Sequence, residues 1–427
     1  AFDLDAHRVL SNGVFDQTDS TIEKPPPGMF FGPLYPSMVY VAMYADPSFA
    51  DDVKCAVEEQ EKNRDYRSCD VYARPIHLLH ALLLALGVVA IGWSAERIAG
   101  RRAAFWLAGL AATTALALEA NLFSFVMTES LTFSLFSLTA GFLLNGLKTQ
   151  KAWSFAASGL SLAALCLTRA SFLVLVPTVV LLILVAGFFL ARPLRVGIRH
   201  AGLFVFLFLL TFTPWIARNA LSIGRPAITE EYGSAAIIER LAFNDMRARE
   251  FLLAFPYCVP VLGPPVAERL AGAGAMKRFE WNAPGSFFAE GRARRLALVE
   301  AHGRLDPVIG PLLRETMKRD WWRHIAVSLP IAWCGAWVSG IWSVLFLPLF
   351  AAACILTIRR RDPMLLLYAA PAFVMLALHA IVANHYPRYN LGLIGPFAAG
   401  GTLMLLSLAA WAWNGAPRKS PKSAPEP

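Results

Sequence analysis

Long apolar runs are the feature that most constrains this chain. A hydrophobic run of roughly 20 residues is long enough to cross the hydrocarbon core of a bilayer. The sequence holds nine runs of about this length, at 77–96, 103–120, 130–147, 153–167, 172–190, 201–216, 340–358, 364–383 and 391–413. The runs therefore predict an all-α polytopic membrane protein.

The composition excludes an ordinary soluble domain. Of the 427 residues, 56% are hydrophobic and 16% are charged, and the mean hydropathy is +0.50, which is far too apolar for a soluble protein. The net charge of +9 is compatible with a nucleic-acid-binding protein. However, the basic residues lie between the apolar runs, so we expect no nucleic-acid partner.

The basic clusters predict the topology, because short basic loops mark the cytoplasmic side. Each cluster is two crossings from the next, so the stretch 153–190 must be a hairpin that turns near Arg169. The clusters are Arg97, Arg101 and Arg102; Lys148 and Lys151; Arg192, Arg195 and Arg199; Arg359, Arg360 and Arg361; and Arg418, Lys419 and Lys422.

This topology divides the chain into an external loop (1–75), a six-span core (76–221), an external region (222–338), three further spans (339–413) and a disordered cytoplasmic tail (414–427). The first visible span starts outside the cell, so we expect a preceding span upstream of Ala1. Within the external loop, the spacing predicts a short amphipathic helix ended by Gly13 and an interfacial helix over 34–44, with Tyr35, Tyr40 and Tyr44 at headgroup depth.

The cysteines fall into two groups. Cys166, Cys334 and Cys354 lie in or beside apolar runs and are expected to be small packing residues. Cys55 and Cys69 lie in a polar external segment, where an oxidising compartment permits a disulfide, but the pairing is not readable from sequence. No cluster of Cys and His has metal-site spacing. The sequence therefore leaves the cofactor unknown: a divalent metal is an open alternative that no motif indicates.

Ionisable residues at a membrane boundary are energetically costly, and each therefore marks a candidate functional position. Guanidinium and ammonium groups bind phosphate, and a carboxylate accepts a proton. Together they fit an outer-leaflet cavity for a substrate with an anionic head and a lipid tail. On the predicted outer side these residues are Asp3, Asp5, Glu23, Lys24, Glu119, Glu129, Arg169, Arg218 and Arg388.

The loop TIEKPPPGMFFGPLYPS, residues 21–37, places Glu23 and Lys24 directly before three prolines. Proline fixes the backbone, so the lysine is presented at a low entropic cost. The alternative is a rigid interfacial loop whose charges lie in water.

Two glutamates flank the outer turn 119–129. Glu129 opens a predicted span, where a carboxylate interacts favourably with the helix dipole and Thr128 can cap the helix. A structural cap and a catalytic carboxylate are the two interpretations. Glu119 ends its span, where the dipole disfavours a carboxylate, so helix structure explains it less well.

The remaining candidates lie in outer turns. Arg169, in LCLTRASFL, is either a snorkelling side chain or an anion ligand. Arg388 and Tyr389, in NHYPRYN, occupy an otherwise apolar turn. His385 in the same turn is a candidate acid or base, because histidine is the side chain suited to that role near neutral pH, but a lone histidine is more often a hydrogen-bonded structural residue. Arg218 marks the exit of the run 201–216.

Six stretches resemble, in order, elements of the polyprenyl-phosphate-sugar-dependent membrane glycosyltransferases of the GT-C fold. The similar branch contains the bacterial aminoarabinose transferases for lipid A and the protein O-mannosyltransferases. The stretches are EKPPPGMFFGPLYP, HLLHALLLALGVVAIGWSAERIAGRRAAFWLAGL, MTESLTFSLFSL, LTRASFLVLVP, FTPWIARNALSIGRP and HYPRYNLGLIGP. They resemble the family's KPP loop, its second and third spans with a GRR turn, and its SEPLF, LTRPT, PWxxRNxxxFG and RYxLPLLP elements. The resemblance covers most of the chain except the external region after Arg225.

The resemblance implies a helical bundle with external interfacial helices and a polyprenyl-phosphate-linked sugar as donor. Lys24 and Arg388, with Tyr389, would contact the lipid phosphate, and Glu23 matches the acidic neighbour of that lysine. The catalytic carboxylate would lie in the first external loop, so Asp5 and Asp3 are the candidates. An aspartate upstream of Ala1 is the alternative.

The resemblance also implies the location and the partners. The protein would lie in the bacterial inner membrane with its site facing the periplasm. Its partners would be the sugar donor, membrane lipid, and a glycan, lipid or protein acceptor.

Two other functional classes share the many-span pattern. A lipid or solute transporter is expected to have Gly/Pro-broken helices and internal repeats, and neither is evident in the sequence. A non-catalytic membrane assembly factor would need no convergent set of ionisable residues.

Overall fold

The computed structural model describes residues 32–61, 74–123, 127–190, 193–229, 232–281, 283–384 and 386–415. These residues form helices and no strand, which confirms the all-α prediction. Seven of the described helices are long and apolar enough to cross a membrane, and the two shorter apolar helices Arg102–Leu118 and Ala152–Thr168 accompany them. Each of the nine predicted runs is therefore helical.

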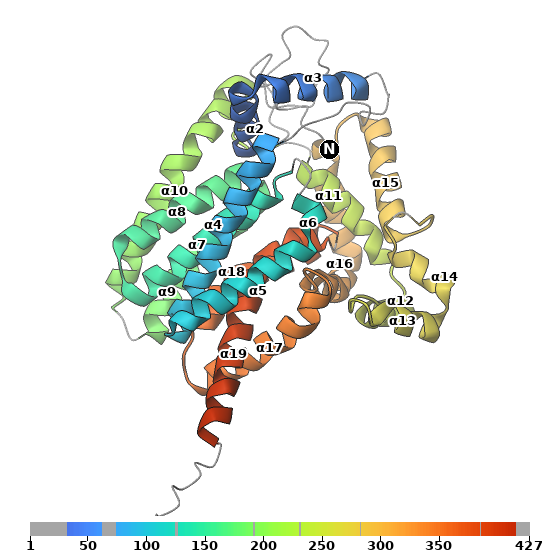
Figure 1. The fold of residues 1–427 in the computed structure, drawn as a ribbon. Helices are drawn as coiled ribbons and strands as arrows, with labels where there is room; N and C mark the ends of the chain where they lie inside the picture. Colours follow the sequence, from blue (N-terminus) through green and yellow to red (C-terminus); the bar gives the residue numbers. More distant parts are fainter. Residues whose placement is uncertain are drawn as a thin grey trace, which may run out of the picture.

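In chain order (Figure 1) the helices are α2 (Leu34–Ala45), α3 (Pro47–Glu61), α4 (Arg74–Ala99), α5 (Arg102–Leu118), α6 (Ala120–Phe123), α7 (Glu129–Thr149), α8 (Ala152–Thr168), η2 (Ala170–Val174), α9 (Leu175–Phe189), α10 (Leu194–Ile223), α11 (Tyr232–Leu241), η3 (Ala242–Asp245), α12 (Ala248–Tyr257), α13 (Gly263–Ala271), α14 (Ala273–Met276), η4 (Lys277–Phe279), α15 (Phe287–His302), α16 (Asp306–Ala336), α17 (Ile341–Arg359), α18 (Met364–Val382), η5 (Pro387–Leu393) and α19 (Ile394–Gly415).

The hairpin predicted within 153–190 is confirmed. Helix α8 ends at Thr168, and Arg169 takes an extended conformation with a φ of −143°. The short 3-10 turn η2 follows, and α9 then begins at Leu175. The chain therefore reverses at Arg169, and this residue is placed at the end of the bundle.

Helix α7 lies at the centre of the bundle between α4 and α8 (Figure 1). Small and hydroxyl side chains let its neighbours approach and supply hydrogen bonds where no water is available. Ser134 donates to the carbonyl of Leu83 on α4. On the other side, the Asn145 amide donates to the Ser154 hydroxyl of α8 at 2.6 Å.

A glycine permits the close approach of α8 and α10. A Cβ added at Gly159 would lie 2.4 Å from the backbone oxygen of Phe204. Any side chain there would push the two helices apart. By contrast, a Cβ added at Gly202 of α10 would have no atom of the described residues within 4 Å.

The two ends of α7 differ in charge. Near its carboxyl end, the Lys148 ammonium donates to the Arg97 carbonyl, which brings the first two basic clusters together. Glu129 begins the same helix at the opposite end. At about 1.5 Å per residue, the 21 residues of α7 separate these ends by about the thickness of a bilayer core.

The helix predicted over 34–44 is confirmed as α2. Tyr35 differs from the prediction, because it is buried in the protein rather than exposed at headgroup depth. Its hydroxyl lies 3.2 Å from Nε2 of His80 on α4, so the packing of α2 on the bundle covers it. Tyr44, at the other end of α2, is exposed. The amphipathic helix predicted before Gly13 lies outside the described residues.

Helices α11 to α15, which belong to the region predicted to be external and are called the external helices below, form a second hydrophobic cluster around Phe243, Phe279, Phe287 and Phe288. This cluster also packs against α16 and α18. Arg240 of α11 ties this cluster to the bundle and is fully buried. Its guanidinium donates to the Ala380 carbonyl of α18 at 2.8 Å and to the His324 carbonyl of α16 at 3.2 Å. Further hydrogen bonds run to Asn244 and Ser328.

A disulfide corrects the expectation for Cys334. Cys334 is bonded to Cys258, 76 residues away in sequence. The end of α12 packs against α16, which brings two cysteines together that the hydropathy pattern could not pair. Cys166 and Cys354 are free, consistent with packing residues. Cys55 is disulfide-bonded, and Cys69 lies outside the described residues.

Candidate functional site

Glu129 is the buried anion of the candidate site. Its side chain is 1% exposed at the first turn of α7, where the helix dipole favours a carboxylate. Oε1 accepts a hydrogen bond from Nη2 of Arg169 at 2.6 Å. Thr128 occupies the N-cap position without a capping hydrogen bond. Its hydroxyl instead accepts from Nε of Arg169 at 2.7 Å.

Arg388 approaches the same carboxylate from η5. Its Nε lies 4.0 Å from Oε1 of Glu129, and its side chain is 36% exposed. Neither Nε of Arg388 nor Oε2 of Glu129 has a hydrogen-bond partner among the described residues, although both atoms are buried. Among the described residues, two arginines therefore face one glutamate, which leaves one positive charge in excess within that part of the site.

Aromatic rings order these arginines. The guanidinium of Arg169 lies 5.6 Å from the ring centroid of Tyr389. That of Arg388 lies 5.2 Å from Tyr386 and 5.4 Å from Tyr389. Cation–π contacts of this kind use the face of a guanidinium, so the N–H groups at its edge can still donate hydrogen bonds, as those of Arg169 do to Glu129 and Thr128.

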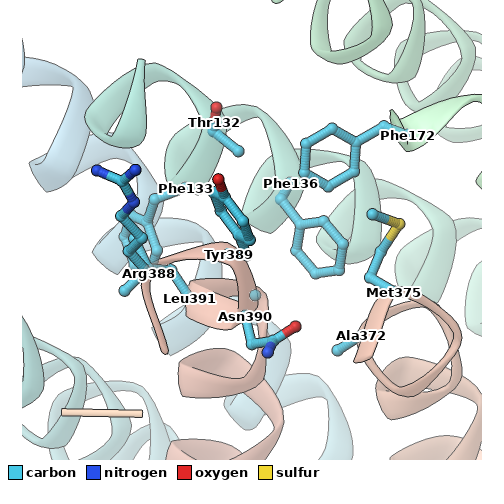
Figure 2. Close-up of a pocket in the computed structure, with 11 residues that line it drawn as sticks. Thr132, Phe133, Phe136, Phe172, Ala372, Met375, Arg388, Tyr389, Asn390 and Leu391 are labelled. Atoms are coloured by element: carbon cyan, nitrogen blue, oxygen red, sulfur yellow. The ribbon is translucent and has the colours of Figure 1, made fainter. Parts of the chain in front are cut away.

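A small pocket opens beside this cluster (Figure 2), with a cavity volume of about 10 Å³, which is close to the room that one water molecule needs. Arg388, Tyr389 and Thr132 lie toward one side of it, while Phe136, Phe172 and Met375 form an apolar wall. The remaining lining residues are Phe133, Ala372, Asn390, Leu391 and Gly392. The Thr132 hydroxyl is buried and has no hydrogen-bond partner among the described residues. The pocket is thus amphiphilic.

Asn390 and His379, which the sequence analysis did not identify as candidates, fix the turn that carries Arg388. Asn390 donates to the Gly335 carbonyl at 3.1 Å, and its Oδ1 lies 3.0 Å from Nδ1 of His379 on α18. The His379 ring also lies 5.5 Å from that of Tyr389. These contacts fix the η5 turn against α16 and α18, and the turn in turn positions Arg388.

The external helices reach the same turn through Tyr386. Its ring meets that of Trp281 edge-on at 4.7 Å, and the guanidinium of Arg292 lies 4.5 Å from the Trp281 ring centroid. Asn384, just before the turn, donates to Glu239 of α11 at 3.2 Å. Burial raises the pKa of Glu239, while nearby arginines and this hydrogen bond oppose the rise.

These external contacts had little sequence signal. Tyr386 and Tyr389 flank Arg388 closely in the NHYPRYN turn, but nothing in the sequence links them to Trp281 or Glu239. Only the packing of α11 and α15 over the turn brings these residues together.

The structure brings together part of the predicted set. Glu129, Arg169, Arg388 and Tyr389 converge. The contacts described for Arg218 are with Trp215 and Asn219 on its own helix. Glu119 accepts a backbone hydrogen bond from Ser339 in the α16–α17 turn. A role for Arg218 or Glu119 at this site stays a prediction.

Five predicted residues lie outside the described residues: Asp3, Asp5, Glu23, Lys24 and His385. In the proline loop, the described residue nearest in sequence to Glu23 and Lys24 is Gly32. A Cβ added at Gly32 would lie 2.3 Å from the backbone oxygen of Leu167. Gly32 therefore packs against the end of α8, directly before Arg169. This contact places the end of the loop beside the site.

No metal centre is evident in the part of the chain that the structure describes, since no three His, Cys, Asp or Glu side chains there are grouped to hold an ion. Comparison of the chain with protein-family models, curated proteins and solved structures gives no match. The likeness to GT-C glycosyltransferases therefore rests on the short motifs, and the chemistry must be argued from the site.

Proposed function

We propose that this protein is a membrane glycosyltransferase that moves a sugar from a polyprenyl-phosphate donor to an acceptor hydroxyl at the outer face of the membrane. The observation that carries the proposal is the amphiphilic pocket, in which the arginine cluster around Glu129 adjoins an apolar aromatic wall. A polyprenyl phosphate has the same division between an anionic head and an apolar tail.

The arginines suit a phosphate ligand. Arg388 is partly exposed, and its buried Nε lacks a partner among the described residues. Within those residues two arginines face the single carboxylate of Glu129. A phosphate oxygen would satisfy that N–H group and neutralise the charge. Lys24 would add a further cation from the proline loop, whose end packs beside Arg169 at Gly32.

Glu129 suits a positioning role better than a catalytic one. Its side chain is 1% exposed, and its Oε1 is held by Arg169, so burial and this ion pair favour Glu129 as the anchor of that arginine. In the proposed reaction an aspartate of the external loop, Asp5 or Asp3, accepts the proton of the acceptor hydroxyl. The hydroxyl oxygen then bonds to the anomeric carbon as the bond to the phosphate oxygen breaks. Polyprenyl phosphate leaves, and its negative charge is stabilised by Arg388, Arg169 and Lys24.

Disulfides support an outward-facing site. Cys258–Cys334 lies beside Gly335, whose carbonyl accepts from Asn390 two residues after Arg388. Disulfides persist in oxidising compartments, so this end of the bundle would face the periplasm or the cell exterior. The multi-pass membrane assignment follows from the apolar helices, while the bacterial inner membrane is part of the proposal.

The test is binding of polyprenyl phosphate to the full chain in nanodiscs, for the parent protein and for Arg388→Gln. Arg360→Gln is the matched control, because Arg360 is exposed and directly follows the carboxyl end of α17, outside the pocket. A hydrogen bond to a charged group contributes about 1.5–3 kcal/mol. Its loss in Arg388→Gln should therefore weaken binding by about tenfold or more. The control should bind as the parent does.

The outcomes separate the functional classes. Absent binding, or equal binding by both variants, would exclude the phosphate role of the pocket and favour an assembly factor. Saturable binding without sugar transfer from a lipid-linked donor would favour a lipid transporter. Binding with transfer that is lost in Arg388→Gln supports the glycosyltransferase.

A further inference from the structure

Helix α13 carries an exposed apolar stripe. Leu262, just before the helix, and Val266 and Leu270 within it are spaced four residues apart, and all three are 45–65% exposed. On a helix this spacing places them on one face. Ala267 is fully buried on the packed side. Glu268, two residues from both Val266 and Leu270, projects in a different direction and is also exposed.

A second exposed apolar stripe runs along the carboxyl half of α16. This helix is kinked at Asp320, where φ is −133°. After the kink, Trp322, Ile325 and Leu329 are 49–62% exposed. The following helix, α17, is of span length and exposes Leu345 near the same end. Only residues 337–340 separate the two helices, so the exposed apolar stripe of α16 leads along the chain into a membrane-spanning helix.

Helix α12 joins the two stripes. It packs against both α13 and α16, and the Trp333 indole of α16 donates to the Phe255 carbonyl of α12 at 2.7 Å. The disulfide Cys258–Cys334 fixes the end of α12 to α16 covalently. In Figure 1, α12 and α13 lie crosswise beside α16, below α11 and α15 and near the upper end of α17.

From this arrangement we infer that α13 and the carboxyl half of α16 form a membrane-surface anchor, with the stripes 262/266/270 and 322/325/329 inserted at the headgroup–acyl boundary of the outer leaflet. The occupant is a phospholipid bilayer rather than a protein, because the α16 stripe leads along the chain into the membrane-spanning α17. Tryptophan is enriched at that boundary, and short amphipathic helices bury their apolar face there.

The anchor sets the height of the external helices. Because α12 is tied to α16 by a disulfide, the external cluster around Phe243 and Phe287 cannot lift from the bilayer without breaking that bond or moving α16. The Arg292–Trp281–Tyr386 contacts and the pocket would then stay at headgroup level. The inference does not depend on the proposed sugar transfer.

Spin labels on α13 test the anchor. Val266→Cys and Leu270→Cys are labelled in the full chain, with Glu268→Cys as the matched control on the same helix. The free Cys166 and Cys354 are replaced by Ala and Ser. Each variant is reconstituted in phosphatidylethanolamine–phosphatidylglycerol nanodiscs, and intact-mass analysis checks that Cys258–Cys334 is retained. The measurement is the relaxation of each label by oxygen, which partitions into lipid, and by a water-soluble nickel chelate.

The anchor predicts a higher oxygen-to-nickel ratio at Val266 and Leu270 than at Glu268. Equal ratios at the three positions, with nickel access throughout, would place the face in water and overturn the inference. Shielding of Val266 and Leu270 from both reagents would also overturn it, because a second copy or a partner protein would then cover the face. The native side chains at all three positions are exposed, so the substitutions leave the core unchanged, and two independent stripe positions report on the same contact.

Discussion

Glu129 and Arg169 form an ion pair, and substituting each residue singly tests whether the carboxylate anchors the arginine. Removing one partner of a buried pair costs about 3–5 kcal/mol, because the other charge is left uncompensated. The two partners differ in this respect, since the Glu129 side chain is 1% exposed and that of Arg169 is 19% exposed. A stranded carboxylate cannot reach water, whereas a stranded guanidinium can turn toward it.

The two single variants should therefore differ in stability. We expect Arg169→Met to lower the free energy of unfolding by about 3 kcal/mol, the lower end of that range, since Arg388 remains near the carboxylate. Glu129→Gln should lower it by only about 1–2 kcal/mol, because the amide oxygen still accepts a hydrogen bond and Arg169 can rehydrate.

The double variant Glu129→Gln/Arg169→Met distinguishes a pair from two independent residues. With the buried carboxylate and its arginine both replaced, it should be at least as stable as Arg169→Met alone, which corresponds to a coupling energy of at least about 1–2 kcal/mol, the loss expected for Glu129→Gln. The assay is reversible unfolding of the full chain in mixed micelles titrated with dodecyl sulfate. Glu268→Gln, at an exposed carboxylate of α13, is the control and should stay within about 0.5 kcal/mol of the parent. Simple additivity of the two single losses would refute the anchoring role of Glu129.

Five further substitutions, at four positions, test the packing of the helices. Gly159→Ala should destabilise the protein by about 1–3 kcal/mol in the same unfolding titration, because the added Cβ would press on the α10 backbone. Its control is Gly202→Ala, where no described atom lies within 4 Å of the added Cβ. That variant should be as stable as the parent or more stable by up to about 1 kcal/mol. Cys334→Ser should lower stability by about 4 kcal/mol under oxidising conditions, since the disulfide closes a long loop, and a reducing agent should abolish the difference between variant and parent. Arg240→Met should change the free energy of unfolding by less than about 2 kcal/mol, because it removes a buried charge together with its hydrogen bonds. Arg240→Ala should lower it by about 3 kcal/mol more, because it also leaves a cavity. Equal losses in the two variants would show that the hydrogen bonds to α16 and α18 dominate.

The candidate site could be predicted only residue by residue. Glu129, Arg169 and Arg388 were identifiable because a charge at the end of an apolar run is costly and therefore informative. Their meeting at one carboxylate was not identifiable, since it depends on how α7, the α8–α9 turn and η5 pack. Asn390 and His379 gave no signal, because polar residues within or beside an apolar run usually form local hydrogen bonds.

The sequence by itself determined the helices, the α8–α9 hairpin and the separation of the basic ends from the site end. These features follow from the length of each apolar run and from the polar residues that interrupt it, which are local properties of the chain. The tertiary structure alone decided the Cys258–Cys334 bond, the burial of Arg240 and the pocket beside Arg388. Each of these brings together side chains from helices that are distant in sequence, and the packing of small residues such as Gly159 sets which helices meet.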